Sequence, residues 1–148
     1  MGYTHYWTEK KKPDAIPAQA ISIIKEILQD AYEKKIIQFE SNNSDPPIVT
    51  REEVRFNGIG EYGHETFCYN VKDDFLLDTG EHFSFCKTAQ KPYDTIVMKV
   101  LIVLKWAFGD DFRLSSDGSF NDEWSDVREE MERKYKIPTG IKRKLNIR

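Results

Sequence analysis

Hydrophobic and polar residues alternate with a period of two in several short segments, which is the pattern of a β-strand with one buried face. Residues 2–8 alternate in this way and are rich in aromatic and β-branched side chains. Residues 54–59, 65–71 and 82–86 are further strand candidates, and residues 112–115 form a shorter one. Because turn-rich segments separate several of these strands, we expect antiparallel pairing through hairpins.

Three other segments have the period of a helix. Pro17 can open the first helix, whose apolar residues recur along one stripe as far as Ala31. The second, residues 92–108, is apolar on nearly every face, which predicts burial deep in the fold or at a subunit interface. A third helix is predicted after a cap at Asn121 or Asp122.

These elements predict one α+β domain over residues 1–137. In it, an antiparallel β-sheet packs with an N-terminal amphipathic helix, a buried central helix and a C-terminal helix. The chain of 148 residues is long enough for such a core. Residues 138–148 are predicted to be a basic C-terminal tail.

The composition narrows the classes of function. A formal net charge of −3 and a pI near 5.7 disfavour a partner that is a DNA or RNA polymer. Two cysteines do not make a disulfide framework, and the first residues lack the apolar run of a signal peptide. The longest apolar run is too short for a membrane span. We therefore expect a cytoplasmic protein without a membrane partner.

Residues 58–63 read GIGEYG and have the glycine spacing of a dinucleotide-binding loop. Such a loop joins a strand to a helix, whereas a second strand pattern follows here. The glycines are therefore interpreted as turn residues of a β-hairpin connection. The flanking Arg55, Asn57, His64 and Glu65 offer a polar rim for a small ligand.

Two further stretches combine aromatic, cationic and hydroxyl side chains. In residues 83–94, a strand with two phenylalanines runs into Lys87 and Lys91 just before a helix start, which favours an anion. A core strand with a solvated, lysine-bearing loop is an equal alternative. In residues 112–118, Arg113 can clamp a phosphate, although a strand ending in a polar turn is the better explanation of each residue judged alone.

Alternation also divides the first strand. It places Tyr3, His5 and Trp7 on one face, with Thr4 and Tyr6 on the other. Either face can pack in a core or present an aromatic surface, and His5 is more often structural than a ligand.

The residues give little support for catalysis. The three histidines lack metal-ligand spacing, so we expect neither a metal nor another cofactor. Cys86 beside Lys87 could be an activated thiol, but no base accompanies it. The inventory is that of a recognition site and not of an enzyme.

Four blocks together carry a resemblance: MGYTHYW, RFNGIGEYGHETF, FSFCKTAQKPYD and RLSSDG, in that order. As a set they resemble a phage-encoded family, the first Thoeris anti-defense family, over residues 1–135. The resemblance implies a non-enzymatic protein that sequesters glycocyclic ADP-ribose, the signal that a bacterial TIR-domain enzyme makes from NAD. It also implies homodimers with the pocket near the interface, larger homo-oligomers and, in some members, a separate site for cyclic oligonucleotides.

The residues fit a ligand of this class, which carries a pyrophosphate, an adenine and ribose hydroxyls. The residues expected to meet the phosphates are Arg55, Lys87, Lys91 and Arg113. Those expected to stack on the base are Trp7, Phe56, Phe83, Phe85 and Tyr93. Those expected to hold the hydroxyls are Asn57, Thr88, Asp94, Ser115 and Asp117.

Two alternatives remain open. A nucleotide-processing enzyme acting on NAD or ADP-ribose would use His64, Glu65 and Cys86. An inhibitor of a host protein would use an aromatic surface.

Overall fold

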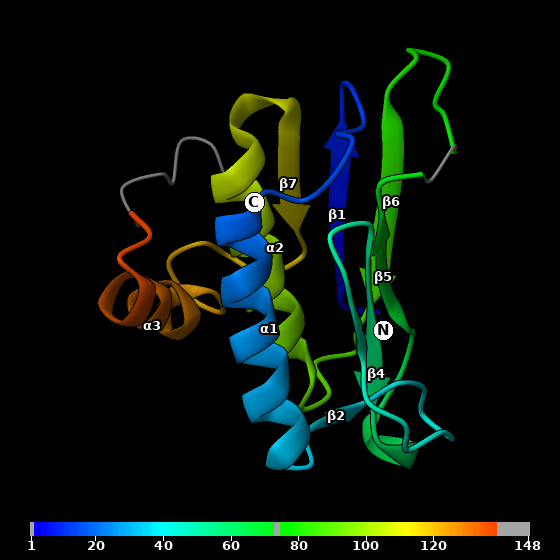
Figure 1. The fold of residues 1–148 in the computed structure, drawn as a ribbon, viewed down its shortest axis with the longest axis vertical. Helices are drawn as coiled ribbons and strands as arrows, with labels where there is room; N and C mark the ends of the chain where they lie inside the picture. The colour runs from blue at the N-terminus through cyan, green and yellow to red at the C-terminus, as the bar shows by residue number, and fades with distance from the viewer. Residues whose placement is uncertain (1, 73–74, 139–148) are drawn as a thin grey trace.

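The computed structural model describes residues 2–72 and 75–138. Strand β1 (Thr4–Glu9) lies in the middle of a three-stranded antiparallel sheet, between β6 (His82–Lys87) and β7 (Phe112–Ser116). Figure 1 shows this sheet beside the helices. The predicted strands at these three positions are confirmed.

A second antiparallel sheet is built around β4 (Glu53–Gly58). Strand β5 (Phe67–Asn70) pairs along one side of β4, while β2 (Ile37–Gln38) and β3 (Ile48–Val49) pair with successive parts of it. The strand predicted at residues 65–71 is therefore shorter than expected. Strands β2 and β3 were not predicted, since two residues are too few to show a period.

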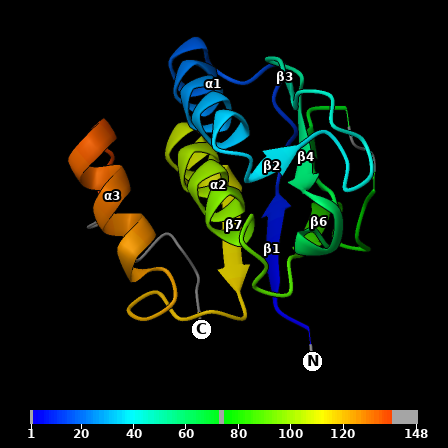
Figure 2. The same ribbon diagram turned by 90° about the horizontal axis from the view of Figure 1, so that it is seen from below.

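The helices cover the inner faces of the strands. Helix α1 (Ala18–Glu33) and helix α3 (Ser125–Tyr135) both contact α2 (Asp94–Phe108), which lies between them in Figure 2. Helix α2 also contacts β7. Its all-round apolar sequence is thus explained by burial deep in the fold, and it ends as predicted at Gly109, whose φ is 63°.

Two helix starts differ from the prediction. Helix α2 begins at Asp94 and not at Pro92. Helix α3 begins only at Ser125, without a side-chain cap, because turns closed on the Ser119 carbonyl occupy the preceding residues. The predicted cap at Asn121 or Asp122 is therefore wrong. The predicted tail lies almost wholly outside the described residues.

The core joins the two sheets through aromatic rings. The centroid of Phe67 on β5 lies 5.4 Å from that of Trp7 on β1 and 5.2 Å from that of Phe56 on β4. The Tyr69 hydroxyl donates to Glu9 Oε2 at 2.7 Å. The described residues thus form a single α+β domain, as the sequence predicts.

Candidate functional site

The outer face of the β6-β1-β7 sheet gathers aromatic, cationic and hydroxyl side chains. Their positions follow from the register, because each β1 residue that points outward has a partner on both neighbouring strands. Tyr6 lies opposite Phe85 and Ser115, and Thr8 lies opposite Phe83 and Arg113. Six predicted site residues belong to this face: Phe83, Phe85, Lys87, Arg113, Ser115 and Asp117.

Four rings on this side form what we call the aromatic platform: Tyr6, Phe75, Phe83 and Phe85. The rings of Tyr6 and Phe83 are nearly parallel, with centroids 6.4 Å apart. Phe83 also neighbours Phe85 at 5.9 Å and Phe75 at 6.4 Å. Phe75 is 57% exposed and Phe85 is 44% exposed. A contiguous, solvent-facing aromatic surface of this kind is characteristic of binding sites.

A hollow of about 210 Å³ adjoins the platform. Its lining residues are Tyr6, Trp7, Thr8, Phe83, Arg113, Leu114 and Ser115. The Arg113 guanidinium forms an ion pair with Glu81, and its side chain remains about half exposed. Near Phe85, Lys87 Nζ lies 5.7 Å from the ring centroid. The face therefore offers stacking surface, hydroxyls and two cations, one toward each end of β1.

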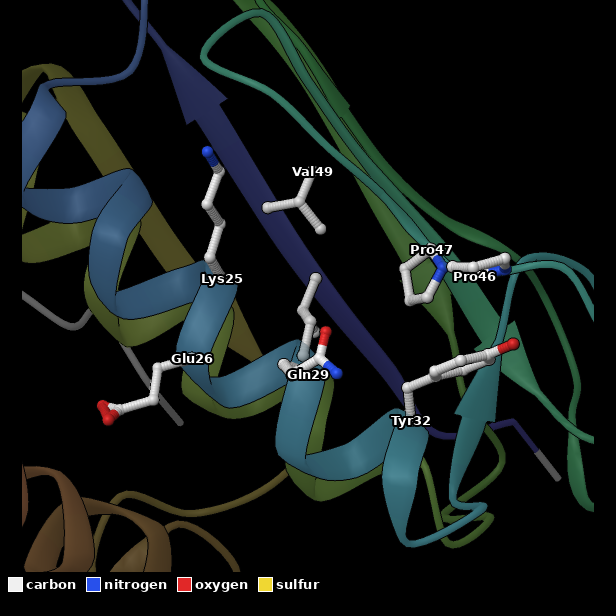
Figure 3. A pocket seen from close by; sticks show the side chains of 8 residues that line it. Lys25, Glu26, Gln29, Tyr32, Pro46, Pro47 and Val49 are labelled. Carbon is white, nitrogen blue, oxygen red and sulfur yellow. The ribbon is translucent and has the colours of Figure 1, made fainter.

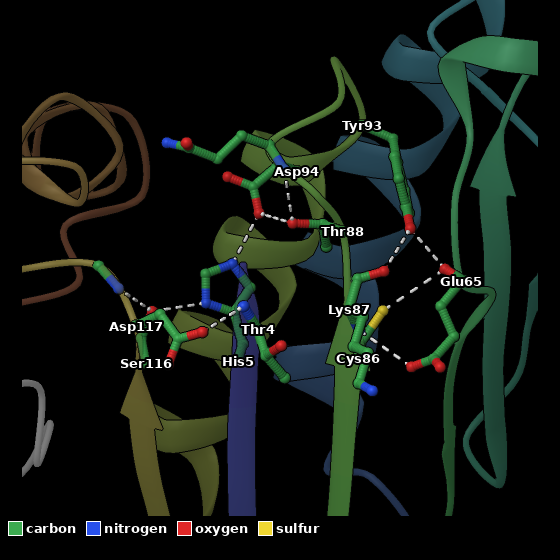
Figure 4. A network of polar contacts seen from close by, with 12 residues as sticks. Thr4, His5, Glu65, Cys86, Lys87, Thr88, Tyr93, Asp94, Ser116 and Asp117 are labelled. Carbon is green, nitrogen blue, oxygen red and sulfur yellow. Dashed lines mark hydrogen bonds and ion pairs between the residues drawn. The ribbon is translucent and has the colours of Figure 1, made fainter. Parts of the chain in front are cut away.

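A buried polar network lies at the end of this sheet, where β1, β7 and α2 meet (Figure 4). His5 Nδ1 lies 2.7 Å from Ser116 Oγ, and Nε2 lies 2.7 Å from Asp94 Oδ1. The Thr88 hydroxyl also donates to Asp94 Oδ1, at 2.6 Å. With Asp94 ionised, Nε2 carries a hydrogen and Nδ1 accepts from Ser116, so the ring is satisfied at both nitrogens.

This network has the order carboxylate, imidazole, hydroxyl of a catalytic triad. Ser116 is only 3% exposed, however, and its Oγ already accepts a hydrogen bond of 2.9 Å from Gly118 N. The hydroxyl therefore lacks the access that a nucleophile needs. The network instead fixes β1 to β7 and to the start of α2, and the prediction that His5 is structural is supported.

The predicted phosphate site at the start of α2 is wrong. The buried Asp94 carboxylate occupies the first turn, where a bound anion would lie. The N–H groups of Ile96 and Val97 donate to the Tyr93 carbonyl, and that of Asp94 donates to the Lys91 carbonyl. These donors are therefore used within the protein.

Near this helix start, the structure contradicts the predicted ligand contacts of three residues, Thr88, Asp94 and Tyr93. Thr88 is fully buried and Asp94 nearly so, and both are bonded to each other, so neither meets sugar hydroxyls. Tyr93 is fully buried, with its hydroxyl donating to Glu65 O at 2.5 Å, so its ring is no stacking surface. Lys91 is partly buried in the same connection, which contains Ala89 and Gln90 at a positive φ of 53°.

The loop between β4 and β5 is closed by internal contacts. Asn57 Oδ1 accepts from the N–H groups of Gly58 and His64, and Asn57 Nδ2 donates to the His64 carbonyl. Gly60 alone of the three glycines has a positive φ, 54°. Gly63 packs closely, since an added Cβ would lie 2.7 Å from Asn57 Oδ1. The hairpin interpretation is confirmed, but Asn57 is not available to a ligand.

Arg55 is likewise engaged within the protein. Its guanidinium is paired with Glu40, and its Nε donates to Glu40 Oε2 at 3.1 Å. Hydrogen bonds from Arg55 and from Thr66 lower the pKa of the Glu40 carboxyl. His64 is exposed at the edge of this loop. Arg55 also belongs to the second sheet and does not line the hollow beside the aromatic platform, so the structure does not group it with Arg113.

Two predicted stacking residues belong to the core. Trp7 is 2% exposed and Phe56 is fully buried, and both pack against Phe67. Their predicted stacking role is wrong, because neither ring faces solvent. The residues that replace them on the platform, Tyr6 and Phe75, were not predicted; alternation had separated Tyr6 from Trp7 but could not identify the solvent face.

Cys86 does not have the surroundings of an activated thiol. Burial, and then the nearby Glu65, raise the pKa of this thiol well above its ordinary value. Among the residues described, no group of three or more histidine, cysteine or acidic side chains is placed to hold a metal ion. We therefore assign no catalytic role to Cys86.

A larger groove of about 400 Å³ lies between α1 and β3 (Figure 3). Its walls include Tyr32, Pro46, Pro47 and Val49, and the polar α1 side chains Lys25, Glu26 and Gln29 also line it. The Tyr32 hydroxyl donates to the Ser44 carbonyl at 3.0 Å. No residue predicted to bind a ligand lines this groove.

None of the described helices has the length and apolar character needed to cross a membrane. Comparison with protein-family models, with curated proteins and with solved structures finds no match for this chain.

Proposed function

We propose that this protein binds and sequesters a small ligand that carries phosphate and an aromatic base, of the cyclic ADP-ribose type, without converting it. The main observation in support is the exposed aromatic platform, which lies beside a hollow lined by Arg113 and Ser115. A base would stack on the rings of Phe83 and Tyr6. A phosphate would accept hydrogen bonds from the guanidinium, and the hydroxyls would meet the ribose.

The energies of such contacts can be compared with the binding free energy that sequestration requires. Stacking contributes about 1–3 kcal/mol per base, and a hydrogen bond to a charged group about 1.5–3 kcal/mol. Sequestration at a Kd of about 100 nM corresponds to roughly −9.5 kcal/mol. One stack and one bidentate clamp approach this value only when the ligand is also well enclosed, because association has its own entropic cost.

A second copy of the chain would provide that enclosure. The hollow of about 210 Å³ is smaller than the roughly 300–1,000 Å³ typical of pockets for small molecules. Leu76 and Leu77, which are 53% and 37% exposed, add apolar surface next to the platform. We therefore propose a homodimer, able to assemble further, in which the platform is covered by the partner. Light scattering with and without ligand measures this.

In this proposal the protein acts in the cytoplasm of an infected bacterium as an anti-defense protein. It withholds glycocyclic ADP-ribose from its effector. A separate site for cyclic oligonucleotides belongs to the same proposal.

The test is retention of intact ligand. Purified protein is mixed with glycocyclic ADP-ribose, freed of unbound ligand and heat-denatured, and the supernatant is analysed by mass spectrometry. Intact ligand from the wild type, and none from Arg113→Ala, supports the proposal. Lys34→Ala removes an exposed cation just after the end of α1 and is the matched control. A chemically altered product favours the enzyme alternative, and failure of the wild type to retain ligand refutes sequestration.

A further inference from the structure

We propose that Glu81 is an internal competitor for the anion-binding site, so that a phosphate binds Arg113 only by displacing this carboxylate. The inference rests on the proposed ligand site and concerns its regulation. Glu81 and Arg113 form an ion pair between the segment before β6 and the start of β7. The carboxylate therefore occupies the position beside the guanidinium that an anionic ligand would take.

The pair is poised for exchange because it is accessible. The Arg113 side chain is 48% exposed and that of Glu81 is 21% exposed. An ion pair at such a surface is weak, so a phosphate with more charge and more acceptor oxygens can displace the carboxylate. The pair consequently selects against weak monoanions and favours a ligand that also gains stacking on Phe83.

Glu81 also connects the anion site to the apolar hairpin of residues 75–83. Leu77 N donates to the Glu81 carbonyl at 2.8 Å, and Phe83 N donates to the Phe75 carbonyl at 3.3 Å. The carboxylate of Glu81 ties this hairpin across to β7 through Arg113. Displacement by a ligand removes that tie, so binding at Arg113 and the mobility of the hairpin are thermodynamically coupled.

The test measures affinity in three variants with defined probes. Binding of ADP-ribose, inorganic pyrophosphate and adenosine is measured by calorimetry for the wild type, Glu81→Gln and Arg113→Ala. Glu33→Gln, which removes an acid from α1, is the control for net charge. Glu81→Gln should bind the two anionic probes up to about fivefold more tightly, equivalent to 1 kcal/mol, and leave adenosine unchanged.

Hydrogen exchange supplies a second readout. Exchange at the amides of residues 75–83 should rise in Glu81→Gln without ligand, and in the wild type when ADP-ribose is bound. If Arg113→Ala abolishes binding but Glu81→Gln does not strengthen it, the proposed competition by Glu81 is refuted, while the ligand site at Arg113 stands. Failure of both wild type and Glu81→Gln to bind either anion overturns the proposed site as well.

Discussion

Replacing His5 by leucine tests whether the buried network holds the ends of the sheet and α2 together. His5 is fully buried and meets Asp94 and Ser116, each at 2.7 Å. Leucine fills a similar volume but leaves the Asp94 carboxylate with Thr88 alone and the Ser116 hydroxyl without its imidazole acceptor. Each buried group left without a partner costs about 1–3 kcal/mol.

We therefore expect His5→Leu to lower the free energy of unfolding by about 3–4 kcal/mol. For a domain of this size, about 2–4 °C of Tm is lost per kcal/mol, so the variant should melt roughly 10 °C lower. Urea unfolding followed by circular dichroism gives the first value, and calorimetry the second. His64→Leu is the matched control, since His64 is exposed and its change should stay within about 0.5 kcal/mol.

A double-mutant cycle then assigns the loss to the pair. Asp94→Leu is the second change of the cycle. In each single variant one buried polar side chain of the pair faces a leucine, whereas the double variant has neither polar side chain. His5 and Asp94 should therefore show a coupling energy of about 1–3 kcal/mol. A cost below about 1 kcal/mol for His5→Leu, together with a coupling near zero, would refute the reasoning.

Two further predictions concern the β4–β5 region and the thiols. Because Arg55 and Thr66 lower the pKa of Glu40 in the folded state, its carboxylate stabilises the protein at neutral pH, by at most about 1 kcal/mol at this partly exposed site. The stability difference from Glu40→Gln should shrink as the pH falls below 4.5, the ordinary pKa, and urea unfolding between pH 7 and pH 3 measures it; a difference that persists at pH 3 would contradict the assignment. A thiol reagent should label exposed Cys68 quickly and buried Cys86 only after unfolding, because burial raises the pKa of Cys86. Two fast thiols in the native protein would contradict this.

The fold was predictable where a long segment keeps one pattern of hydrophobic residues along its whole length. The continuous apolar sequence of α2 predicts burial on several sides, and α2 indeed contacts α1, α3 and β7. Strands β2 and β3 escaped prediction because two residues carry no period, and their position is set by pairing with β4. The start of α3 escaped because backbone turns, not a side-chain cap, precede it.

The sequence predicted which types of residue the candidate site contains better than it predicted which of them lie together. The sequence indicates stacking rings and a cation near β6 and β7, and the register places Phe83, Phe85, Arg113 and Ser115 on one face. It could not exclude Thr88 and Asp94. A hydroxyl and a carboxylate look alike in a sequence whether they meet a ligand or each other, and only the distance of 2.6 Å between them decides.

The blocks that carry the family resemblance separate into two physical roles in this fold. His5, Thr88, Asp94 and Ser116 come from three of those blocks and meet in one buried network, so these residues specify how the sheet ends and where α2 begins. Arg113 lies on the solvent side instead, where it is paired with Glu81. Stability and ligand affinity should therefore respond to different substitutions. Loss of His5 should lower the melting temperature, whereas loss of Arg113 should weaken phosphate binding in a protein that melts nearly as the wild type does.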